Sequence, residues 1–423
     1  MVLLSLWVVL KWAIAIVTVF LGIIVIHEFG HFIVAKWSGV TVPVFAVGFG
    51  PKLVKWVKGG TEYSIRPYLF GGFVQLSGEV AQETFFRVGE QVAVKWDEDN
   101  RIAVIGEPSD LPEGEVYTLR DLDLSRRMEM TLDSAVGVHT YRVRPHARLM
   151  TNRKNSLPLV EPSEQMIAKP WWKRAAIILA GPGMNFLLAG VLFSLVFLHN
   201  GIPVNQPVLG SIIAGSPAAQ AGLMPGDRVV AVDGRPVSTW VDLVQNIRGD
   251  FVTPLRPLSI QVVRNGQTRT VRVTPALVQG HTPELGVAAT LTHNPVVSAA
   301  SGFSTVYQAS AQTLSVLYHQ VLAHHQFKDL SGPVGIAYVI GEEAQTGFWN
   351  VLMIGGLLSL NLGLMNLLPI PALDGGRLFF MLVELVRGRA LDPRKEGFVH
   401  IIGFALLMLF GVVITYRDVL RLF

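Results

Sequence analysis

Two histidines and a glutamate near the N-terminus form the pattern H-E-x-x-H. His27 and His31 are four residues apart, and on a helix this spacing places two side chains on one face with their Cβ atoms roughly 5–6 Å apart. Both imidazoles can therefore bind one zinc ion. Glu28 would lie beside the metal, where its carboxylate can take a proton from a water molecule. The three residues predict a metal site that activates water.

The segment around this pattern is strongly apolar. Residues 12–26 are almost purely aliphatic and aromatic, and each charged side chain in a membrane span costs on the order of 2.5–3.5 kcal/mol by insertion scales. The same pattern occurs by chance in soluble helices, where it belongs to a solvated face. A chance match is disfavoured here because lipid penalises every polar residue, whereas metal binding gives all three a role.

The composition favours an integral membrane protein. Of the 423 residues, 50% are hydrophobic and 16% are charged, and the mean hydropathy is +0.43, which does not fit an ordinary soluble enzyme. The net charge of +4 comes without a basic, aromatic-interleaved stripe, so we expect no nucleic-acid partner. Because the chain has no cysteine, a metal must be held by His, Asp or Glu.

Four apolar segments are long enough to cross a bilayer, which takes about 20 residues. They are residues 4–34, 175–198, 348–368 and 399–416. The first has no convincing small-residue cleavage site, so we expect a retained span rather than a signal peptide. Lys and Arg residues flank the loops between spans one and two and between spans three and four. Both loops are therefore predicted to be cytoplasmic, with both termini and residues 200–347 outside.

Two different pieces separate the first two spans. Residues 40–76 are rich in Val, Phe, Tyr and Gly, and the alternation in residues 71–76 predicts a β-hairpin whose glycines are turns or points of close approach. It is either a plain surface hairpin or, as its aromatic character favours, one that dips into the membrane beside the metal helix. Residues 80–167 are polar, with turn clusters between short alternating runs. They predict a small β-rich soluble insert without a catalytic pattern.

Residues 207–276 alternate between turn signals and short apolar runs. The sequence Ala-Gly-Leu-x-x-Gly-Asp-x-Val at residues 221–229 is followed by a helix from Trp240 and a hairpin that turns at Asn265-Gly266. This order resembles a bacterial PDZ domain, whose groove binds an extended peptide beside an exposed strand. Peptide binding or size filtering is favoured, and packing against the membrane part as a lid is the alternative.

A catalytic zinc usually has three protein ligands and one open position, so a third ligand must lie elsewhere. The best candidate is Asp374, at the end of the stretch Asn366-Leu-Leu-Pro-Ile-Pro-Ala-Leu-Asp374 that closes the third span. Two prolines break regular helix there, and such breaks are tolerated at membrane depth where they line a functional cavity. The alternative is a loop outside the bilayer with Asp374 as a solvated cap.

The paired motifs resemble those of the site-2 protease family of intramembrane zinc metalloproteases. They are His27-Glu28-x-x-His31 and Asn366-x-x-Pro-x-Pro-x-Leu-Asp374-Gly, and Ala-Gly-Pro-Gly-Met-Asn at residues 180–185 is also similar to that family. Residues 330–335 resemble the family's segment ahead of the third span. Four spans with an outer PDZ domain are similar to the bacterial regulator-of-sigma-E protease branch. The best-known members of that branch have two PDZ domains and lack so long an insert.

The resemblance implies a zinc cofactor, with His27, His31 and Asp374 as ligands and Glu28 as the general base. It implies that Asn366 holds the substrate backbone and that a membrane-reentrant hairpin presents substrate as an extended strand, through Gly72, Phe73, Val74 and Gln75. The implied substrates are single-span membrane proteins, such as an anti-sigma factor already trimmed by another protease, or a remnant signal peptide. The implied location is the bacterial inner membrane, with the active site near its cytoplasmic side.

The sequence thus predicts an α-helical polytopic membrane protein with about four transmembrane helices, a membrane-reentrant β-hairpin, a β-rich cytoplasmic insert and an extracytoplasmic PDZ-like α+β domain. The expected order is span one (1–37), the hairpin region (38–79), the insert (80–167), span two (168–200), the PDZ domain (201–290), a linker with an amphipathic segment (291–347), span three with its proline motif (348–385) and span four (386–423).

The predicted reaction is hydrolysis of peptide bonds within the membrane. A catalytically silent scaffold that recruits peptides is a second hypothesis, but it leaves an intact H-E-x-x-H pattern without a purpose. A zinc transporter would favour more ionisable residues along spans two and four, which have almost none. A serine protease of the rhomboid kind is disfavoured because no G-x-S-x-G pattern is present.

Overall fold

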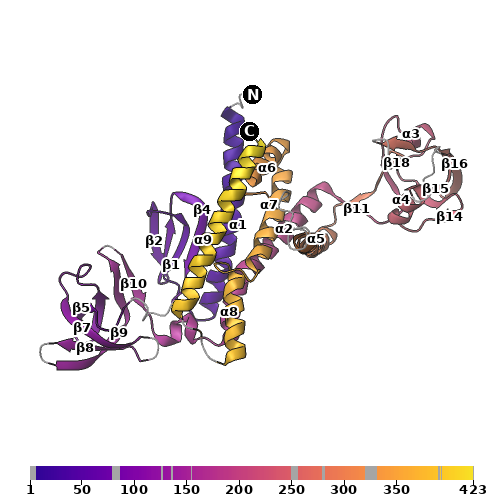
Figure 1. The fold of residues 1–423 in the computed structure, drawn as a ribbon. Helices are drawn as coiled ribbons and strands as arrows, with labels where there is room; N and C mark the ends of the chain where they lie inside the picture. The colour runs from indigo at the N-terminus through magenta and orange to yellow at the C-terminus, as the bar shows by residue number, and fades with distance from the viewer. Residues whose placement is uncertain are drawn as a thin grey trace. The chain divides into compact units, whose positions relative to one another are not determined.

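The computed structural model of the chain describes residues 6–78, 86–124, 127–134, 137–153, 155–248, 256–278, 282–319, 331–388, 391 and 393–422. The chain divides into two compact units (Figure 1). Unit 1 contains residues 1–192 and 305–423, and unit 2 contains residues 193–304. The start of the predicted insert and Leu330 lie outside the described residues.

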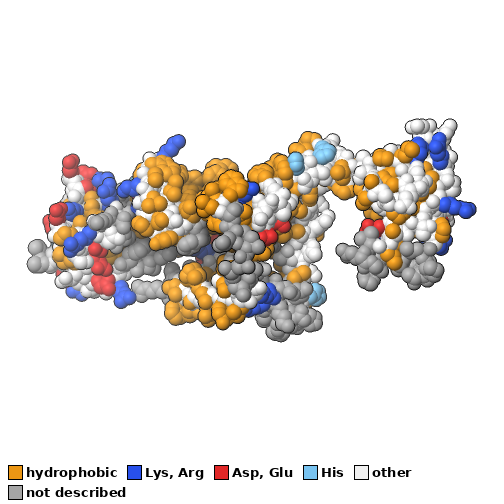
Figure 2. Space-filling model, turned by 90° about the horizontal axis from the view of Figure 1, so that it is seen from above, with side chains coloured by type: hydrophobic (Ala, Val, Ile, Leu, Met, Phe, Trp, Pro, Cys, Tyr) orange, Lys and Arg blue, Asp and Glu red, His pale blue; other side chains and the backbone are white. Residues whose placement is uncertain are grey.

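Among the described residues, four helices are long and apolar enough to cross a membrane. They are α1 (Leu6–Trp37), α2 (Trp171–Asn200), α7 (Phe348–Asn366) and α9 (Pro393–Leu422). Large apolar side chains cover the outside of α9, where Ile401, Phe404 and Leu409 are 58–68% exposed. Figure 2 shows hydrophobic side chains over the helical part, whereas charged side chains gather over the insert. An apolar exterior of this kind fits contact with lipid, and the four predicted spans are confirmed as helices long and apolar enough to cross a membrane.

The helix of the third predicted span is interrupted at its two prolines, as the sequence predicts. Helix α7 stops at Asn366, and a loop leads to a separate helix, α8 (Asp374–Arg387). Pro369 and Pro371 explain the break because proline has no N–H to continue the helical hydrogen bonds. The proline motif therefore starts at the end of α7, continues through the loop and ends at the start of α8.

Helix α6 (Pro333–Thr346) packs against α1, α7 and α9. Its N-terminus is capped from a distance, because the buried side chain of Asp418 accepts hydrogen bonds at 2.8 Å from the backbone N–H groups of Gly332 and Gly335. Both glycines are needed for this approach, since a Cβ at either position would lie about 3 Å from the Asp418 carboxylate. The capping carboxylate fixes α6 to α9 and satisfies backbone donors that α6 leaves free.

A mixed four-stranded sheet follows α1, in the order β2-β3-β1-β4. Its strands are β1 (Val44–Phe49), β2 (Val54–Lys58), β3 (Thr61–Ile65) and β4 (Tyr68–Gln75). The pair β1–β3 is parallel, and the pairs β2–β3 and β1–β4 are antiparallel. The predicted hairpin at residues 71–76 is instead the end of β4, the edge strand of this sheet.

Gly71 and Gly72 lie inside β4 and do not form a turn. A Cβ at Gly72 would lie 2.9 Å from the carbonyl oxygen of Ala46 on β1 and 3.5 Å from Cγ of Glu28 on α1. A Cβ at Gly71 would collide with the ring of Phe49. The close-approach role predicted for these glycines is therefore confirmed, and the turn role is wrong.

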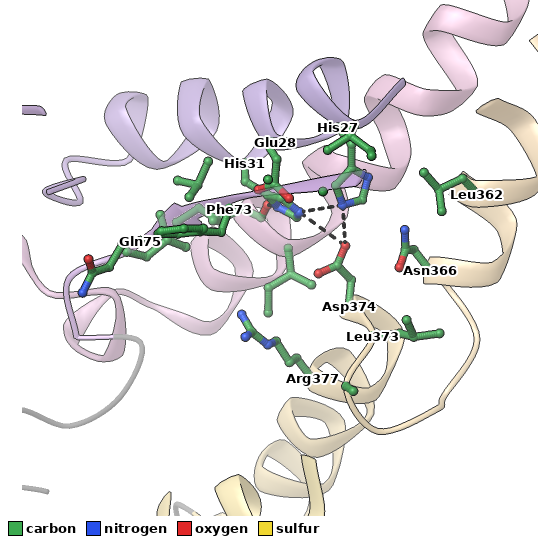
Figure 3. Close-up of a pocket in the computed structure, with 18 of the residues that line it drawn as sticks. His27, Glu28, His31, Phe73, Gln75, Leu362, Asn366, Leu373, Asp374 and Arg377 are labelled. Carbon is green, nitrogen blue, oxygen red and sulfur yellow. Dashed lines mark hydrogen bonds and ion pairs between the residues drawn. The ribbon is translucent and has the colours of Figure 1, made fainter. Parts of the chain in front are cut away.

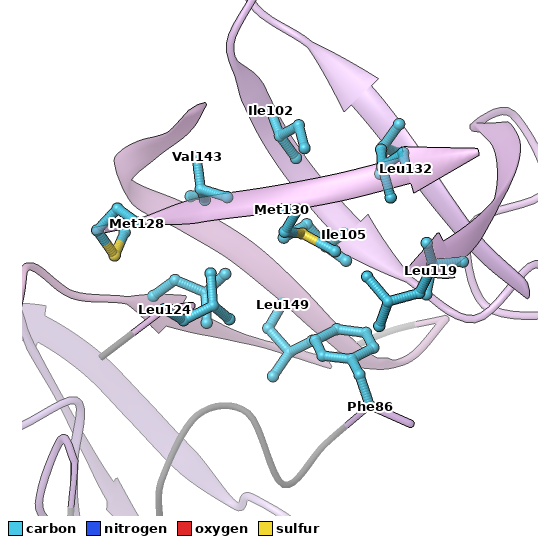
Figure 4. Close-up of a cluster of buried hydrophobic side chains, with 14 residues drawn as sticks. Phe86, Ile102, Ile105, Leu119, Leu124, Met128, Met130, Leu132, Val143 and Leu149 are labelled. Atoms are coloured by element: carbon cyan, nitrogen blue, oxygen red, sulfur yellow. The ribbon is translucent and has the colours of Figure 1, made fainter. Parts of the chain in front are cut away.

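The insert folds as a small β-barrel. Its strands are β5 (Gln91–Trp96), β6 (Ile102–Gly106), β7 (Glu115–Asp123), β8 (Glu129–Ser134), β9 (Gly137–Asn152) and β10 (Asn155–Leu159). The long strand β9 pairs with β8 through its first half and with β10 through its second half, and it also pairs with β6. Strands β9, β6, β5, β7 and β8 thus close a ring around buried side chains that include Ile105, Met130 and Leu149 (Figure 4). The predicted β-rich insert is confirmed. Two 3₁₀ turns, η2 (Pro162–Glu164) and η3 (Met166–Ala168), lead from the barrel to α2.

Unit 2 has its own hydrophobic core, which includes Val229, Leu243 and Ile260. A sheet in the order β14-β13-β15-β16 forms its largest layer. The predicted hairpin is confirmed, because β15 and β16 turn at Asn265 and Gly266, both with positive φ as a tight turn requires. Its elements are β11 (Ile202–Pro203), β12 (Leu209–Ile212), α3 (Pro217–Gln220), β13 (Arg228–Val232), β14 (Arg235–Pro236), α4 (Trp240–Arg248), β15 (Leu258–Arg264), β16 (Gln267–Val273), β17 (Ala276–Val278), β18 (Thr282–Glu284), β19 (Val287–Ala289) and β20 (Leu291–Thr292), followed by α5 (Pro295–Val316), which reaches into unit 1.

Candidate metal centre

Three side chains converge between α1 and the start of α8. The Nε2 atoms of His27 and His31 are 3.2 Å apart, and each lies 3.3 Å from Oδ2 of Asp374 (Figure 3). Both histidines are on one face of α1 as the spacing predicts, and both are more than 90% buried. Among the described residues this is the one group of three or more His, Asp or Glu side chains close enough to share a metal ion.

Partners outside this group fix the orientation of both imidazoles. Nδ1 of His31 donates to the carbonyl oxygen of Ile177 at 2.8 Å, which leaves its Nε2 as a lone pair. Nδ1 of His27 lies 3.1 Å from the side-chain amide of Asn185, which is fully buried on α2. The atom that faces His27 in the structure is the amide nitrogen Nδ2, while the amide oxygen Oδ1 is buried without a partner. Turning the amide by 180° gives Oδ1 a partner, because Nδ1–H of His27 then donates to it and leaves Nε2 with a lone pair. Outer partners of this kind are the usual companions of histidine ligands.

The three converging atoms are better suited to binding a cation than to forming hydrogen bonds with one another. Two imidazole lone pairs and a carboxylate oxygen are all acceptors, and Oδ2 of Asp374 is buried without a hydrogen-bond donor. Gly181 of α2 borders the space between them, since a Cβ there would collide with Nε2 of His31 and lie 2.8 Å from Cε1 of His27. Two nitrogen donors and one oxygen donor are a suitable set for zinc with one position left open.

The loop after α7 determines where Asp374 lies. Gly375 and Gly376 allow the first turn of α8 to press against the loop, because a Cβ at Gly376 would lie 2.9 Å from the carbonyl carbon of Ile370 and a Cβ at Gly375 would collide with the carbonyl group of Leu367. The side chain of Asp374 is only 15% exposed. It is therefore not a solvated cap.

The centre opens into a cavity of about 870 Å³. Every residue that the sequence singles out lines it: the three metal-ligand candidates, Glu28, Asn366, and residues 72–75 of β4. Strand β4 runs directly beside Glu28, since a Cβ at Gly72 would lie 3.5 Å from Cγ of Glu28 on α1. Figure 3 shows Asn366 on the opposite side of Asp374 from Phe73 and Gln75.

Three residues of the site were not singled out by sequence reasoning. Arg377 lines the cavity from α8, and its position one helical turn after Asp374 was the signal that could have identified it. Asn185 and Gly181 belong to the motif at residues 180–185, which was noticed only as a resemblance. Their roles depend on contacts between α1 and α2, which sequence spacing does not reveal.

The sequence profile of Peptidase family M50 matches residues 15–410. The zinc metalloprotease RasP of Geobacillus kaustophilus (strain HTA426) is 37% identical over 98% of this chain and 99% of its own length. The regulator of sigma-W protease RasP of Bacillus subtilis (strain 168) is 33% identical over 97% of this chain and 98% of its own length. The probable protease eep of Enterococcus faecalis (strain ATCC 700802 / V583) is 30% identical over 98% of this chain and all of its own length.

Proposed function

Because the chain belongs to peptidase family M50, the site-2 protease family, we propose that it hydrolyses peptide bonds within or near the transmembrane segments of single-span membrane proteins. The family resemblance, the zinc metalloprotease activity and the zinc cofactor predicted from the sequence are confirmed by this membership and by the relatives' names. The single observation that supports the proposed site best is the convergence of His27, His31 and Asp374 beside Glu28 in one buried cavity.

In this proposal His27, His31 and Asp374 hold the zinc ion. When bound, zinc supplies a Lewis acid that polarises the scissile carbonyl group and acidifies a water molecule. Glu28 takes the proton of the attacking water and returns it to the leaving amine. The outer partners Ile177 and Asn185 would keep the proton of each imidazole on Nδ1, so that the Nε2 lone pair is directed at the centre.

Strand β4 is the proposed platform for substrate. It lies at the edge of its sheet and pairs only with β1 among the described strands, so its outer backbone groups are available to an extended peptide. A helical substrate hides its carbonyl groups in hydrogen bonds and must unwind before it can pair in this way. The substrate would pair as an extended strand with residues Gly72, Phe73, Val74 and Gln75 of β4. Asn366 would bind the substrate backbone on the other side of the cavity.

We extend the proposal to the partners and location. The name of the Bacillus subtilis relative, regulator of sigma-W protease, supports an anti-sigma factor as substrate. We propose further that this substrate is first trimmed by another protease, and a remnant signal peptide is the other substrate class. Unit 2 would act as a PDZ domain outside the cytoplasm that binds or filters substrate tails. The active site would lie near the cytoplasmic side of the bacterial inner membrane.

The proposal is tested with Glu28→Gln in the full-length protein. Zinc content and cleavage of a single-span test substrate are measured together in liposomes. We expect zinc content to stay at the wild-type level, because no ligand is removed, and cleavage to fall by about 10²–10⁴-fold. Glu342→Gln, on the exposed end of α6, is the matched control and should cleave normally. Substantial cleavage by Glu28→Gln would refute its role as the base.

A further inference from the structure

The loop that leads to Asp374 has an unusual backbone conformation. Ala372, two residues before Asp374, has a φ of +80°. Residues other than glycine rarely adopt this region, and alanine has no polar side chain to support it locally. Leu373, the residue that precedes α8, contributes no side-chain cap to the helix. The conformation of this loop must therefore be held by contacts from elsewhere.

Helix α9 supplies those contacts. Nδ1 of His400 accepts a hydrogen bond of 2.8 Å from the backbone N–H of Ala372. Gly403, one turn later on the same face of α9, lies directly against Pro371, since a Cβ there would be 2.7 Å from its carbonyl oxygen. The ring of His400 also packs edge-on against Phe380 of α8, with centroids 5.4 Å apart. One face of α9 thus contacts both the loop and the helix that begins at Asp374.

His400 acts on the loop as a hydrogen-bond acceptor for the backbone N–H of Ala372. Because Nδ1 accepts a hydrogen bond from the Ala372 N–H, the ring is neutral and carries its own proton on Nε2. Nε2 has no hydrogen-bond partner, and its distance to Oε1 of Glu396 is 3.9 Å, too long for a hydrogen bond. Removing the acceptor while keeping an apolar side chain of similar size would therefore separate the hydrogen bond from the packing.

We propose that His400 is a positioning residue for the metal centre. Its hydrogen bond holds Ala372 at positive φ, and this conformation sets Asp374 opposite His27 and His31. The inference rests on the proposed role of Asp374 as a metal ligand. It goes further by assigning to the fourth span the task of shaping the third ligand's loop.

The test measures zinc affinity of the purified full-length protein by competition with a chromophoric chelator, independently of cleavage. His400→Leu keeps the packing and loses the acceptor, so we expect zinc to bind about 10- to 100-fold more weakly. His400→Asn places an amide oxygen near the position of Nδ1 and should retain most of the affinity. Adding Ala372→Gly to His400→Leu should restore part of it, because glycine adopts positive φ without strain. His139→Leu, on the exposed surface of the barrel, is the control and should match the wild type.

Three results would overturn the inference: wild-type affinity in His400→Leu, equal losses in the Leu and Asn variants, or no recovery with Ala372→Gly. The melting temperature of the zinc-free protein shows whether each variant folds. If His400→Leu does not fold, Gly403→Ala replaces it, since its added methyl group pushes Pro371 away from α9, and wild-type affinity there would also overturn the inference.

Asp374→Asn, measured alongside, distinguishes the two possible failures. If it binds zinc as tightly as the wild type, the proposed ligand set is wrong and the positioning role falls with it. If it loses zinc while His400→Leu does not, the ligand set stands and only the role of His400 is refuted.

Discussion

Unit 1 and unit 2 each contain a buried carboxylate, and the two differ in what surrounds them. Asp227 in unit 2 is fully buried and receives three hydrogen bonds, two at 2.6 Å from the guanidinium group of Arg264 and one at 2.9 Å from the backbone N–H of Met224. Asp374 in unit 1 directs Oδ2 at two imidazole nitrogens and has no donor there.

The difference separates a structural carboxylate from a functional one. A buried charge is stable when it is paired and its oxygens accept hydrogen bonds from the protein, which is the condition of both oxygens of Asp227. The lone pairs at Asp374 are directed, together with those of His27 and His31, at a common point. In the proposed centre a metal ion supplies the compensating charge of this group, so we expect the protein's stability and activity to depend on that ion.

The largest expected effect comes from removing the charge of Asp374. In Asp374→Asn, cleavage should fall on the order of 10³-fold, because metal catalysis supplies several kcal/mol of transition-state stabilisation. Free zinc at about 100 times its dissociation constant should stabilise the wild type by about 2.7 kcal/mol and the variant much less. The melting temperature with and without zinc measures this. A full zinc-induced shift in the variant would contradict the comparison.

The corresponding change at Asp227 should lower the stability of unit 2 without changing the zinc content. Asp227→Asn removes the charge that pairs with Arg264, so we expect a loss of about 2 kcal/mol in the stability of unit 2. Zinc content per folded molecule should not change. Thermal unfolding of the full-length protein measures the loss, with Asp121→Asn on the barrel surface as the control. A loss of zinc in Asp227→Asn would show that the two carboxylates do not have separate roles.

The smallest expected effect is a loss of stability of unit 2 at low pH. Burial opposes the ionisation of Asp227, but the hydrogen bonds from Arg264 and Met224 outweigh it and hold the pKa below its usual value. The unfolded chain therefore binds a proton more readily than the folded one, and the stabilisation present above about pH 4 is lost as the pH falls through the lower, folded-state pKa. The unfolding temperature of unit 2 should fall with pH in this range, and less steeply in Asp227→Asn. Identical slopes in both proteins would contradict this assignment.

The sequence was informative wherever structure depends on local spacing. The face shared by His27 and His31 follows from a separation of four residues in a helix. The turn at Asn265-Gly266 follows from the preference of these residues for positive φ. The choice of Asp374 as the third ligand combined the need for one more donor with a motif known from the family, and the structure brings it to the other two.

Contacts between distant segments were not predictable in this way. The hydrogen bond from Ala372 to His400 and the cap that Asp418 gives to α6 join residues 28 and 83–86 positions apart, and neither leaves a periodic pattern. The pairing of β4 with β1 is another example, because the sequence left both a turn role and a close-approach role open for Gly71 and Gly72 until their neighbours on β1 were known. The closure of the barrel depends on β9, which pairs with β8 before His146 and with β10 after it, and His146 has a φ of +59°.

The most direct test of the metal centre is zinc X-ray absorption spectroscopy on the Glu28→Gln protein and on the same protein with Asp374→Asn added. The account predicts two imidazole nitrogens at about 2.0–2.1 Å and oxygen ligands at about 2.0–2.2 Å in the first. It predicts weakened binding and the loss of the carboxylate oxygen in the second. An identical coordination shell in both proteins together with undiminished zinc affinity in the second would contradict the proposed centre, because the loss of a carboxylate ligand must weaken zinc binding even where water replaces it.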